Sequence, residues 1–504
     1  MTSNLFTVLS AAFVPERTAL RTGEGRAFTY GDLVAETGRV ANALAALGVK
    51  PGDRVAVQAE KSVEALFLAL GVVRAGAALL PLNTAYTAKE LDYFVADAEP
   101  AVFVCDPAQA QTLAPIAAAH GVKALETLGP DGEGSLTDKV RAAAPEFDDV
   151  PRDEGDLAAI LYTSGTTGRS KGAMITHGNL ASNSAALATA WRFTADDVLL
   201  HALPIFHTHG LFTATNTLLR AGGSMIFLPK FDAGEAIALL PQATTMMGVP
   251  TFYSRLLSRD DFTADLAAHI RLFVSGSAPL SAETHKAFFA RTGKAILERY
   301  GMTETNMITS NPYEGERRPG TVGLPLPGVE VRIADEAGEE LPRGEIGMIE
   351  TRGPHVCRGY WRNAEKTKAE FRDSGFFVTG DLGLIEPDGY VRIVGRGKDL
   401  IITGGFNVYP AEVEAAIDAI EGVAESAVIG LPHPDFGEGV TAVVSPKPAA
   451  TLDEGAIRTI LERDLAKFKV PKKVVIVDSL PRNTMGKIQK NVLRDTYRDS
   501  FAGA

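Results

Sequence analysis

The chain has 504 residues, more than the ~250–300 at which a single core usually stops growing, so at least two domains are expected. Its composition, 45% hydrophobic and 22% charged residues, is that of a soluble globular protein. The net charge of -12 argues against nucleic acid and anionic lipid as partners, because the long-range field has the wrong sign for both.

Cysteine content and the N-terminus bear on the compartment. Cys105 and Cys357 are far apart and have no metal-ligand spacing, so neither a disulfide framework nor a zinc site is indicated. Residues 1–20 lack the pattern of a secretory signal, and the most apolar window, residues 65–73, is shorter than the ~20 residues that a membrane span needs. We therefore expect a cytoplasmic protein without a membrane partner.

The N-terminal part alternates between predicted helices and strands. Thr29 and Asp32 form a capping-box start for a helix that runs toward Leu47, and Thr87 and Glu90 begin another helix in the same way. The other expected elements here are a helix at 63–74 and strands at 54–58, 77–82 and 101–105. This alternation predicts largely parallel sheets with helices on both faces.

The pattern changes twice further along the chain. Residues 145–156 are acidic and contain proline, and we expect a surface loop there rather than a linker. Between residues 329 and 395, turns at 335–338 and 387–389 join runs with period-two character, which favours a barrel-like antiparallel piece. After Arg396 a small α+β unit begins, in which Pro410 occupies the first position of a helix.

The expected fold class is therefore α/β. A large N-terminal domain, residues 1–397, combines helix-covered sheets with the barrel-like β piece. A small, mobile α+β domain follows at residues 398–504, with strands expected at 400–403, 426–430, 441–445 and 474–477 and helices at 411–420 and 454–466.

The string Tyr-Thr-Ser-Gly-Thr-Thr-Gly-Arg-Ser-Lys-Gly at residues 162–172 is the strongest local signal. It lies between two apolar runs, 157–161 and 173–175, and its glycines allow a ligand close to the backbone while Lys171 adds a positive charge. The lysine lacks the Gly-Lys-Ser/Thr context of a Walker loop. A phosphate-binding loop is predicted, with a Gly/Ser/Thr-rich surface loop as the alternative.

Four further strings follow in order: residues 275–280 (Ser-Gly-Ser-Ala-Pro-Leu), 300–305 (Tyr-Gly-Met-Thr-Glu-Thr), the pair 379–381 with 395–399, and 480–487 (Leu-Pro-Arg-Asn-Thr-Met-Gly-Lys). Each alone reads as a cap, a turn or a solvated lysine. Together they resemble the adenylate-forming superfamily, which includes acyl-CoA synthetases, luciferases and adenylation domains. Within it, residues 204–210 and 297–301 are most similar to malonyl-CoA synthetases.

The resemblance implies ATP, Mg²⁺ and coenzyme A, the last as a co-substrate. It places Tyr300 against adenine and Asp381 and Arg396 at the ribose, and Glu304 and Thr163 at Mg²⁺, which prefers oxygen ligands. The implied ATP-binding residues are Thr163, Ser164, Gly165, Thr166, Thr167, Gly168, Lys171, Ser277, Ala278, Pro279, Tyr300, Gly301, Met302, Thr303, Asp381, Arg396 and Lys487.

Four of the implied residues are candidates for catalysis: Lys171, Thr303 at the α-phosphate, Glu304 and Lys487. An ammonium such as Lys487 offsets the repulsion between a carboxylate and a phosphate, and does so effectively only in a closed site. The resemblance also implies a hinge at Lys398, a coenzyme A contact at Gly405, and a lysine acetyltransferase as a candidate partner acting on Lys487.

Arg299 and His207 are the candidates for binding the acid. Arg299 precedes the residue assigned to adenine, and an unpaired guanidinium there is costly unless the substrate brings a second carboxylate. His207 is placed beside the acyl group by resemblance. Pairing of Arg299 with Glu298 is the open alternative.

The predicted activity is ATP-dependent ligation of malonate to coenzyme A through malonyl-adenylate, with release of AMP and pyrophosphate and with methylmalonate as a poorer substrate. A synthetase for an aromatic or medium-chain acid is the first alternative. A non-catalytic nucleotide-binding sensor is the second, and the presence of both Glu304 and Lys487 argues against it.

Overall fold

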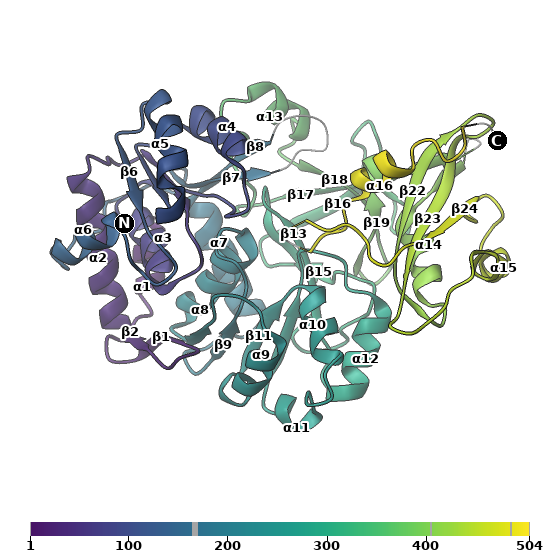
Figure 1. Cartoon of the computed structure of the whole chain (residues 1–504), viewed down its shortest axis with the longest axis horizontal. Helices are drawn as coiled ribbons and strands as arrows, with labels where there is room; N and C mark the ends of the chain where they lie inside the picture. The colour runs from purple at the N-terminus through teal and green to yellow at the C-terminus, as the bar shows by residue number, and fades with distance from the viewer. Residues whose placement is uncertain (1, 164–169, 404–405, 484–485, 503–504) are drawn as a thin grey trace.

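The computed structural model describes residues 2–163, 170–403, 406–483 and 486–502 (Figure 1). Ser164, Gly165, Thr166, Thr167, Gly168 and Gly405 lie outside the described residues. Among the residues described, no helix is long and apolar enough to cross a membrane.

A six-stranded sheet carries the predicted phosphate-binding string. Its order is β6-β5-β3-β4-β7-β8, and all neighbours are parallel except the antiparallel pair β7 and β8, which flank the string. The strands are β3 Arg54–Gln58, β4 Ala78–Pro81, β5 Val102–Cys105, β6 Ala124–Thr127, β7 Leu157–Thr163 and β8 Lys171–Thr176. The strands expected around the string are thus confirmed.

Helices cover both faces of this sheet because alternate strand residues point to opposite sides. Val102 and Val104 pack in the same core as the apolar helix α3 (Val63–Arg74), whereas Phe103 packs with α4 (Ala88–Ala98). The other helices here are α2 Tyr30–Ala46, α5 Ala110–Ala119 and α6 Ser135–Ala142. Both predicted capping boxes, at Thr29 and Thr87, are present.

A nine-stranded sheet positions the other strings. Its order is β15-β14-β13-β12-β11-β9-β10-β1-β2, and the run from β13 to β1 is parallel. The strands are β1 Thr18–Thr22, β2 Ala27–Thr29, β9 Val198–His201, β10 Ser224–Phe227, β11 Thr245–Gly248, β12 Leu272–Ser275, β13 Leu297–Met302, β14 Asn306–Ser310 and β15 Leu324–Pro325. The strings at 204–210, 275–280 and 300–305 therefore follow carboxyl ends at one edge, where ligands bind in open α/β sheets.

The remaining helices of the large domain surround the two sheets (Figure 1). They are α1 Leu5–Ser10, α7 His177–Ala190, α8 Asn216–Ala221, α9 Ala233–Leu239, α10 Pro250–Leu257, α11 Ala264–Ala267, α12 Ala282–Thr292 and α13 Ala364–Glu370. The short helical segments are a π-helix at His209–Thr215 and 3-10 turns at Pro107–Gln109, Leu240–Gln242 and Gly397–Asp399. Residues 145–156 form the predicted loop, tied down by the ion pair between Arg74 and Asp149.

The antiparallel β piece expected between residues 329 and 395 is present. Strands β16 (Glu330–Ala334), β17 (Gly347–Arg352), β18 (Phe377–Ile385) and β19 (Val391–Arg396) pair antiparallel in that order. A further bridge joins Val391 of β19 to Gly323, and the piece encloses one core formed by Tyr300, Ile308, Val322, Ile333, Ile349 and Val391. The turn at 387–389 joins β18 to β19 as predicted.

A small α+β unit follows, at the C-terminal end of the colour range in Figure 1. It contains β20 Ile401–Thr403, β21 Phe406–Val408, β22 Val423–His433, β23 Gly437–Pro446, β24 Lys473–Ile476, α14 Pro410–Asp418, α15 Glu454–Asp464 and α16 Lys490–Tyr497. The sheet has its own core, in which Val413 and Ile417 of α14 pack against Val428 and Val444. A large sheet domain and a small α+β domain are thus confirmed, while the boundary at 397/398 stays a prediction.

Candidate active site

Two oxygen-bearing side chains from different sheets meet at the predicted metal position. Thr163 ends β7, and its hydroxyl donates a hydrogen bond of 3.1 Å to Oε1 of Glu304, which lies in the turn after β13. The Tyr360 hydroxyl lies 3.1 Å from the same oxygen. Glu304 is only 6% exposed, and burial raises the pKa of its carboxyl group.

This pair fits Mg²⁺, because a hard cation accepts a few protein oxygens when phosphates supply the other ligands. Within the described part of the chain, no group of three or more His, Cys, Asp or Glu side chains is arranged to hold a metal ion. The donor set at Thr163 and Glu304 is therefore one that needs a phosphate-bearing ligand to complete it.

The predicted ribose group is assembled from three strands. Arg396 at the end of β19 places Nε 2.7 Å from Oδ1 of Asp381 in β18, and the hydroxyl of Tyr300 in β13 donates to Oδ2. Asp381 is 3% exposed, and burial raises its pKa although Arg396 opposes the shift. The carboxylate is held from two sides, which fixes it as an acceptor for hydroxyl groups.

The remaining nucleotide candidates adjoin this group. Gly301, Met302 and Thr303 continue from β13, and a Cβ on Gly301 would lie 2.0 Å from the backbone oxygen of Asn306, so only glycine fits there. Ser277, Ala278 and Pro279 follow β12 at the same sheet edge. The nucleotide candidates between β7 and β8, which are Ser164, Gly165, Thr166, Thr167 and Gly168, lie outside the described residues.

The two candidate lysines come from opposite ends of the chain. Lys171, at the start of β8, pairs with Glu370 of α13, whose Oε1 lies 3.2 Å from its Nζ. Lys487 belongs to the small domain, and its side chain is exposed. Crowding by protein groups nevertheless lowers its pKa by desolvation, and Arg396 acts in the same direction.

The surroundings of Lys487 show where the small domain sits. The charges of Asp381, Arg299 and Glu304, all on the large domain, contribute to the pKa shift of its ammonium group. The preceding Gly486 lies against Thr251 of α10, because a Cβ on that glycine would be 3.6 Å from the Thr251 hydroxyl oxygen. The structure thus brings Lys487 to the group formed by the other strings. Lys398 lies in the 3-10 turn after β19.

Arg299 is buried, at 3% exposure, yet its Nε and Nη2 have no hydrogen-bond partner. Burial accordingly lowers its pKa. A Cβ on Gly276 would lie 2.3 Å from Cζ of Arg299, so the guanidinium packs directly on a glycine backbone. Neighbouring Glu298 instead accepts from the Leu280 backbone at 3.0 Å, and does not satisfy these two nitrogens.

Two histidines line the same region. Burial lowers the pKa of His207 to about 3, with Lys487 and Arg299 acting in the same direction, so its ring is neutral at physiological pH. His209, which has no role predicted from sequence, places Nδ1 3.1 Å from the Ser277 hydroxyl oxygen, while its Nε2 is buried without a partner. Neutral rings do not repel the buried guanidinium, and they do not neutralise it either.

Sequence reasoning missed two further groups, Tyr360 and Glu370. Tyr360 donates to Glu370 and contacts Glu304, so it links the metal position to the acid that holds Lys171. No local pattern distinguishes a tyrosine before Trp361 or a glutamate at the end of a seven-residue helix. Their proximity arises only when α13 lies against β8 (Figure 1).

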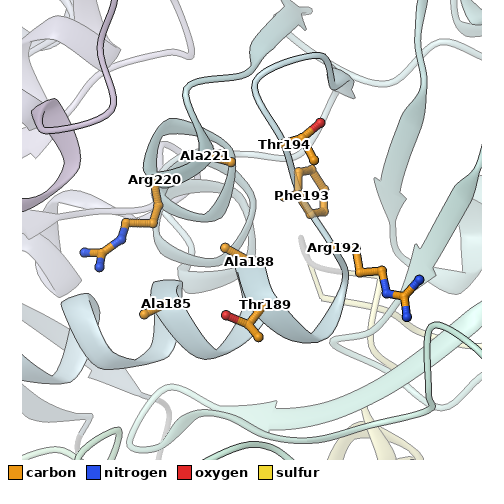
Figure 2. Close-up of a pocket in the computed structure, with 8 residues that line it drawn as sticks. All are labelled: Ala185, Ala188, Thr189, Arg192, Phe193, Thr194, Arg220 and Ala221. Atoms are coloured by element: carbon orange, nitrogen blue, oxygen red, sulfur yellow. The ribbon is translucent and has the colours of Figure 1, made fainter.

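A hollow of about 370 Å³ between α7 and α8 contains none of the predicted site residues (Figure 2). Its floor includes Ala188 and Phe193, and Arg192 and Arg220 point away from one another at its two sides. Arg192 instead pairs with Glu314. The two arginines therefore do not converge on a common anion.

Three sheets bring together the Asp381 carboxylate and the oxygen pair of Thr163 and Glu304, and the small domain adds Lys487, an arrangement typical of a nucleotide-using α/β enzyme. A family model described as AMP-binding enzyme matches residues 9–361, and one described as AMP-binding enzyme C-terminal domain matches residues 412–487. The chain belongs to the AMP-binding enzyme family, and the predicted superfamily membership is confirmed.

One solved structure and two relatives of known activity are similar to this chain over nearly its whole length. ATP-bound MatB from Rhodopseudomonas palustris is 62% identical, with a TM-score of 0.98 over 99% of this chain and 100% of that chain. A feruloyl-CoA synthase from Amycolatopsis sp is 37% identical over 97% of this chain and 98% of its own length. The malonate-CoA ligase of Arabidopsis thaliana is 33% identical over 98% of this chain and 90% of its length.

The ATP-bound and apo forms of this MatB differ in how closely they match the present structure. The apo form of the same MatB has the same identity and coverage but a TM-score of 0.87. The lower score therefore reflects a different spatial arrangement of one relative, and the present structure matches the ATP-bound arrangement more closely.

Proposed function

We propose that the protein is an AMP-forming malonate-CoA ligase. One observation carries the choice of acid: Arg299 is buried beside two neutral histidines with two nitrogens that have no partner. A hydrocarbon acid leaves that guanidinium uncompensated, whereas the distal carboxylate of malonate forms a forked, charge-assisted pair with it. The similarity to malonate-CoA ligases supports the same assignment.

The reaction has two halves. Malonate attacks the α-phosphate of ATP in line, forming malonyl-adenylate and releasing pyrophosphate; the coenzyme A thiol then displaces AMP. Thr163 and Glu304 would hold Mg²⁺, which would supply charge neutralisation for the phosphates. Lys487 offsets the repulsion between the attacking carboxylate and the α-phosphate, and Thr303 and Lys171 position the phosphates. Tyr300, Asp381 and Arg396 hold the nucleoside.

A panel of mono- and dicarboxylic acids assayed for acid-dependent AMP release tests the assignment. We expect malonate to be used far better than acetate or propionate, because a site built around a charge strongly rejects acids that lack its partner. Methylmalonate should be a poorer substrate, since one methyl group shifts preference by only ~1–3 kcal/mol. Equal use of acetate and malonate would contradict the assignment.

An aromatic acid is the second candidate, and the likeness to feruloyl-CoA synthase favours it. The same panel separates the two, because ferulate brings no carboxylate that reaches Arg299 in addition to the reacting one. Preference for ferulate over malonate would select this alternative. A sensor without catalysis would release no AMP with any acid.

We also propose Lys487 as an acetylation site for a lysine acetyltransferase, and a cytoplasmic location. The exposure of the Lys487 side chain supports access by another enzyme. Acetylation removes the charge and should abolish adenylation as Lys487→Ala does. Mass spectrometry after incubation with an acetyltransferase and acetyl-CoA checks this, and protein lacking a label at Lys487 would rule the site out.

A further inference from the structure

The carboxylate of Glu370 gathers three donors at the end of α13. Its Oε1 lies 3.2 Å from Nζ of Lys171 and 2.6 Å from Nζ of Lys366, while Oε2 accepts from the Tyr360 hydroxyl. Two lysines therefore share a single oxygen. Their ammonium groups are within two hydrogen-bond lengths of each other, where they repel unless an anion lies between them.

Helix stability alone does not explain this arrangement. Lys366 precedes Glu370 by four residues, which is the less favourable order for an ion pair along a helix. Lys171 comes from β8, so the carboxylate connects α13 to the start of that strand rather than to its own helix. Glu370 is also mostly buried, with its side chain 20% exposed.

Space for a larger anion adjoins the pair. A hollow of about 550 Å³ is lined by both lysines together with Tyr93, Asn363 and Glu365. Through Tyr360, the same cluster connects to Glu304 at the proposed metal position. A diphosphate group carries more negative charge than a carboxylate, so it competes well for two ammonium groups that already lie together.

We propose that Lys366 and Lys171 form a diphosphate-binding pair, serving the tail of ATP and free pyrophosphate, and that Glu370 occupies it when no diphosphate is bound. Glu370 is thus an internal anion that competes with the ligand. The two lysines bind Glu370 when no diphosphate is present, and they bind the diphosphate when it is. This inference rests on the proposed function for the presence of ATP and pyrophosphate, but it concerns residues to which that function assigns no role, Lys366 and Glu370.

Calorimetric titration with magnesium pyrophosphate tests the pair without any turnover. We expect Glu370→Gln to bind pyrophosphate about tenfold more tightly, since it removes the competing charge but keeps the side-chain shape. Lys366→Ala and Lys366→Gln should each bind it about tenfold more weakly. AMP lacks the diphosphate, so its affinity should be the same in every variant.

A variant on the same helix serves as the control. Lys368→Ala removes an exposed ammonium that does not line the hollow. It should leave pyrophosphate affinity near that of the unmodified protein, which separates direct contact from a general change of charge. Circular dichroism of each variant verifies that it is folded.

Whether Glu370→Gln binds pyrophosphate more tightly or more weakly than the unmodified protein decides whether Glu370 competes with the diphosphate. A carboxylate that merely braces the two lysines gives equal or weaker pyrophosphate binding on replacement, and that result overturns the proposal. Titration with α,β-methylene-ATP shows whether the nucleotide tail responds in the same way as free pyrophosphate; a response to neither also overturns it. Malonate-dependent AMP release by the unmodified protein is measured separately, so failure of the proposed function is distinguished from failure of this site.

Discussion

At the residue scale, the acid pocket depends on how a single guanidinium is buried. Gly276 leaves the space that Arg299 occupies, and the strand places Glu298 on the Leu280 backbone instead of on the arginine. Since a guanidinium keeps its proton, the unfavourable burial is relieved by an anion rather than by deprotonation. The cost of burying this unpaired guanidinium is the physical basis of the proposed selectivity for a second carboxylate.

Replacing Arg299 by alanine should therefore cost ~2–5 kcal/mol in malonate use, about 30-fold to several thousand-fold in kcat/KM. Steady-state kinetics with malonate checks this, with ATP affinity measured in parallel as the control for an intact nucleotide site. Arg299→Lys keeps the charge but loses the fork, so it should recover only part of the loss. Unchanged malonate kinetics in Arg299→Ala would show that the guanidinium does not bind the acid.

At the scale of elements, helix α14 of the small domain lies near α12 of the large one. Asp418 in α14 accepts a hydrogen bond of 2.7 Å from the Ser426 hydroxyl. Burial, reinforced by Glu414 and by Glu283 of α12, raises the pKa of Asp418 to about 7. Glu283 also pairs with Lys447 of the small domain at 2.7 Å, so the charges at this junction belong to both domains.

The stability of this junction should depend on pH. Because the pKa of Asp418 is higher in the folded chain, its contribution is fully present below pH 4 and is lost as pH rises through about 7. Asp418→Asn stays neutral and keeps an acceptor for Ser426, so the variant should gain stability relative to the unmodified protein as pH rises from 5 to 8.

Urea unfolding followed by circular dichroism at several pH values measures this gain. One pKa unit corresponds to about 1.4 kcal/mol, which sets the scale of the effect. Glu421→Gln, at an exposed position just beyond α14, is the control and should show no such trend. Parallel pH profiles for Asp418→Asn and the unmodified protein would mean that the carboxyl group titrates normally.

At the scale of the whole molecule, the two domains share one site. Lys487 reaches the charges of Asp381 and Arg299 across the domain boundary, and the arrangement matches an ATP-bound relative better than its apo form. A lysine in this position obstructs the entry of a thiol, so we expect the small domain to turn at Lys398 between the two half-reactions.

Two substitutions separate the half-reactions. Lys487→Ala should abolish adenylation, measured by malonate-dependent exchange between ATP and pyrophosphate, while sparing thioester formation from supplied malonyl-adenylate. Gly405→Leu should show the reverse, because a side chain narrows the path predicted for the pantetheine arm. Equal losses in both assays for both variants would argue against alternation of domains.

Much of this architecture follows from local sequence. The α3 boundaries, the capping boxes at Thr29 and Thr87 and the start of α14 at Pro410 were all predictable, because caps, proline and apolar periodicity act within a few residues. The period-two patterns between residues 329 and 395 likewise predicted antiparallel strands, but they do not specify which strands pair or how far the sheet closes.

The sequence by itself determined the family and the order of its strings, and it selected Glu304, Arg299 and Lys487 as site candidates, because each lies in a short pattern that keeps its chemistry wherever the chain places it. Only the tertiary structure decided that Arg299 has nitrogens without partners and that Glu370 lies between two lysines. Those facts depend on distant parts of the chain meeting at one place, as Lys171 of β8 and Glu370 of α13 do across 199 residues, and no local pattern encodes such a meeting.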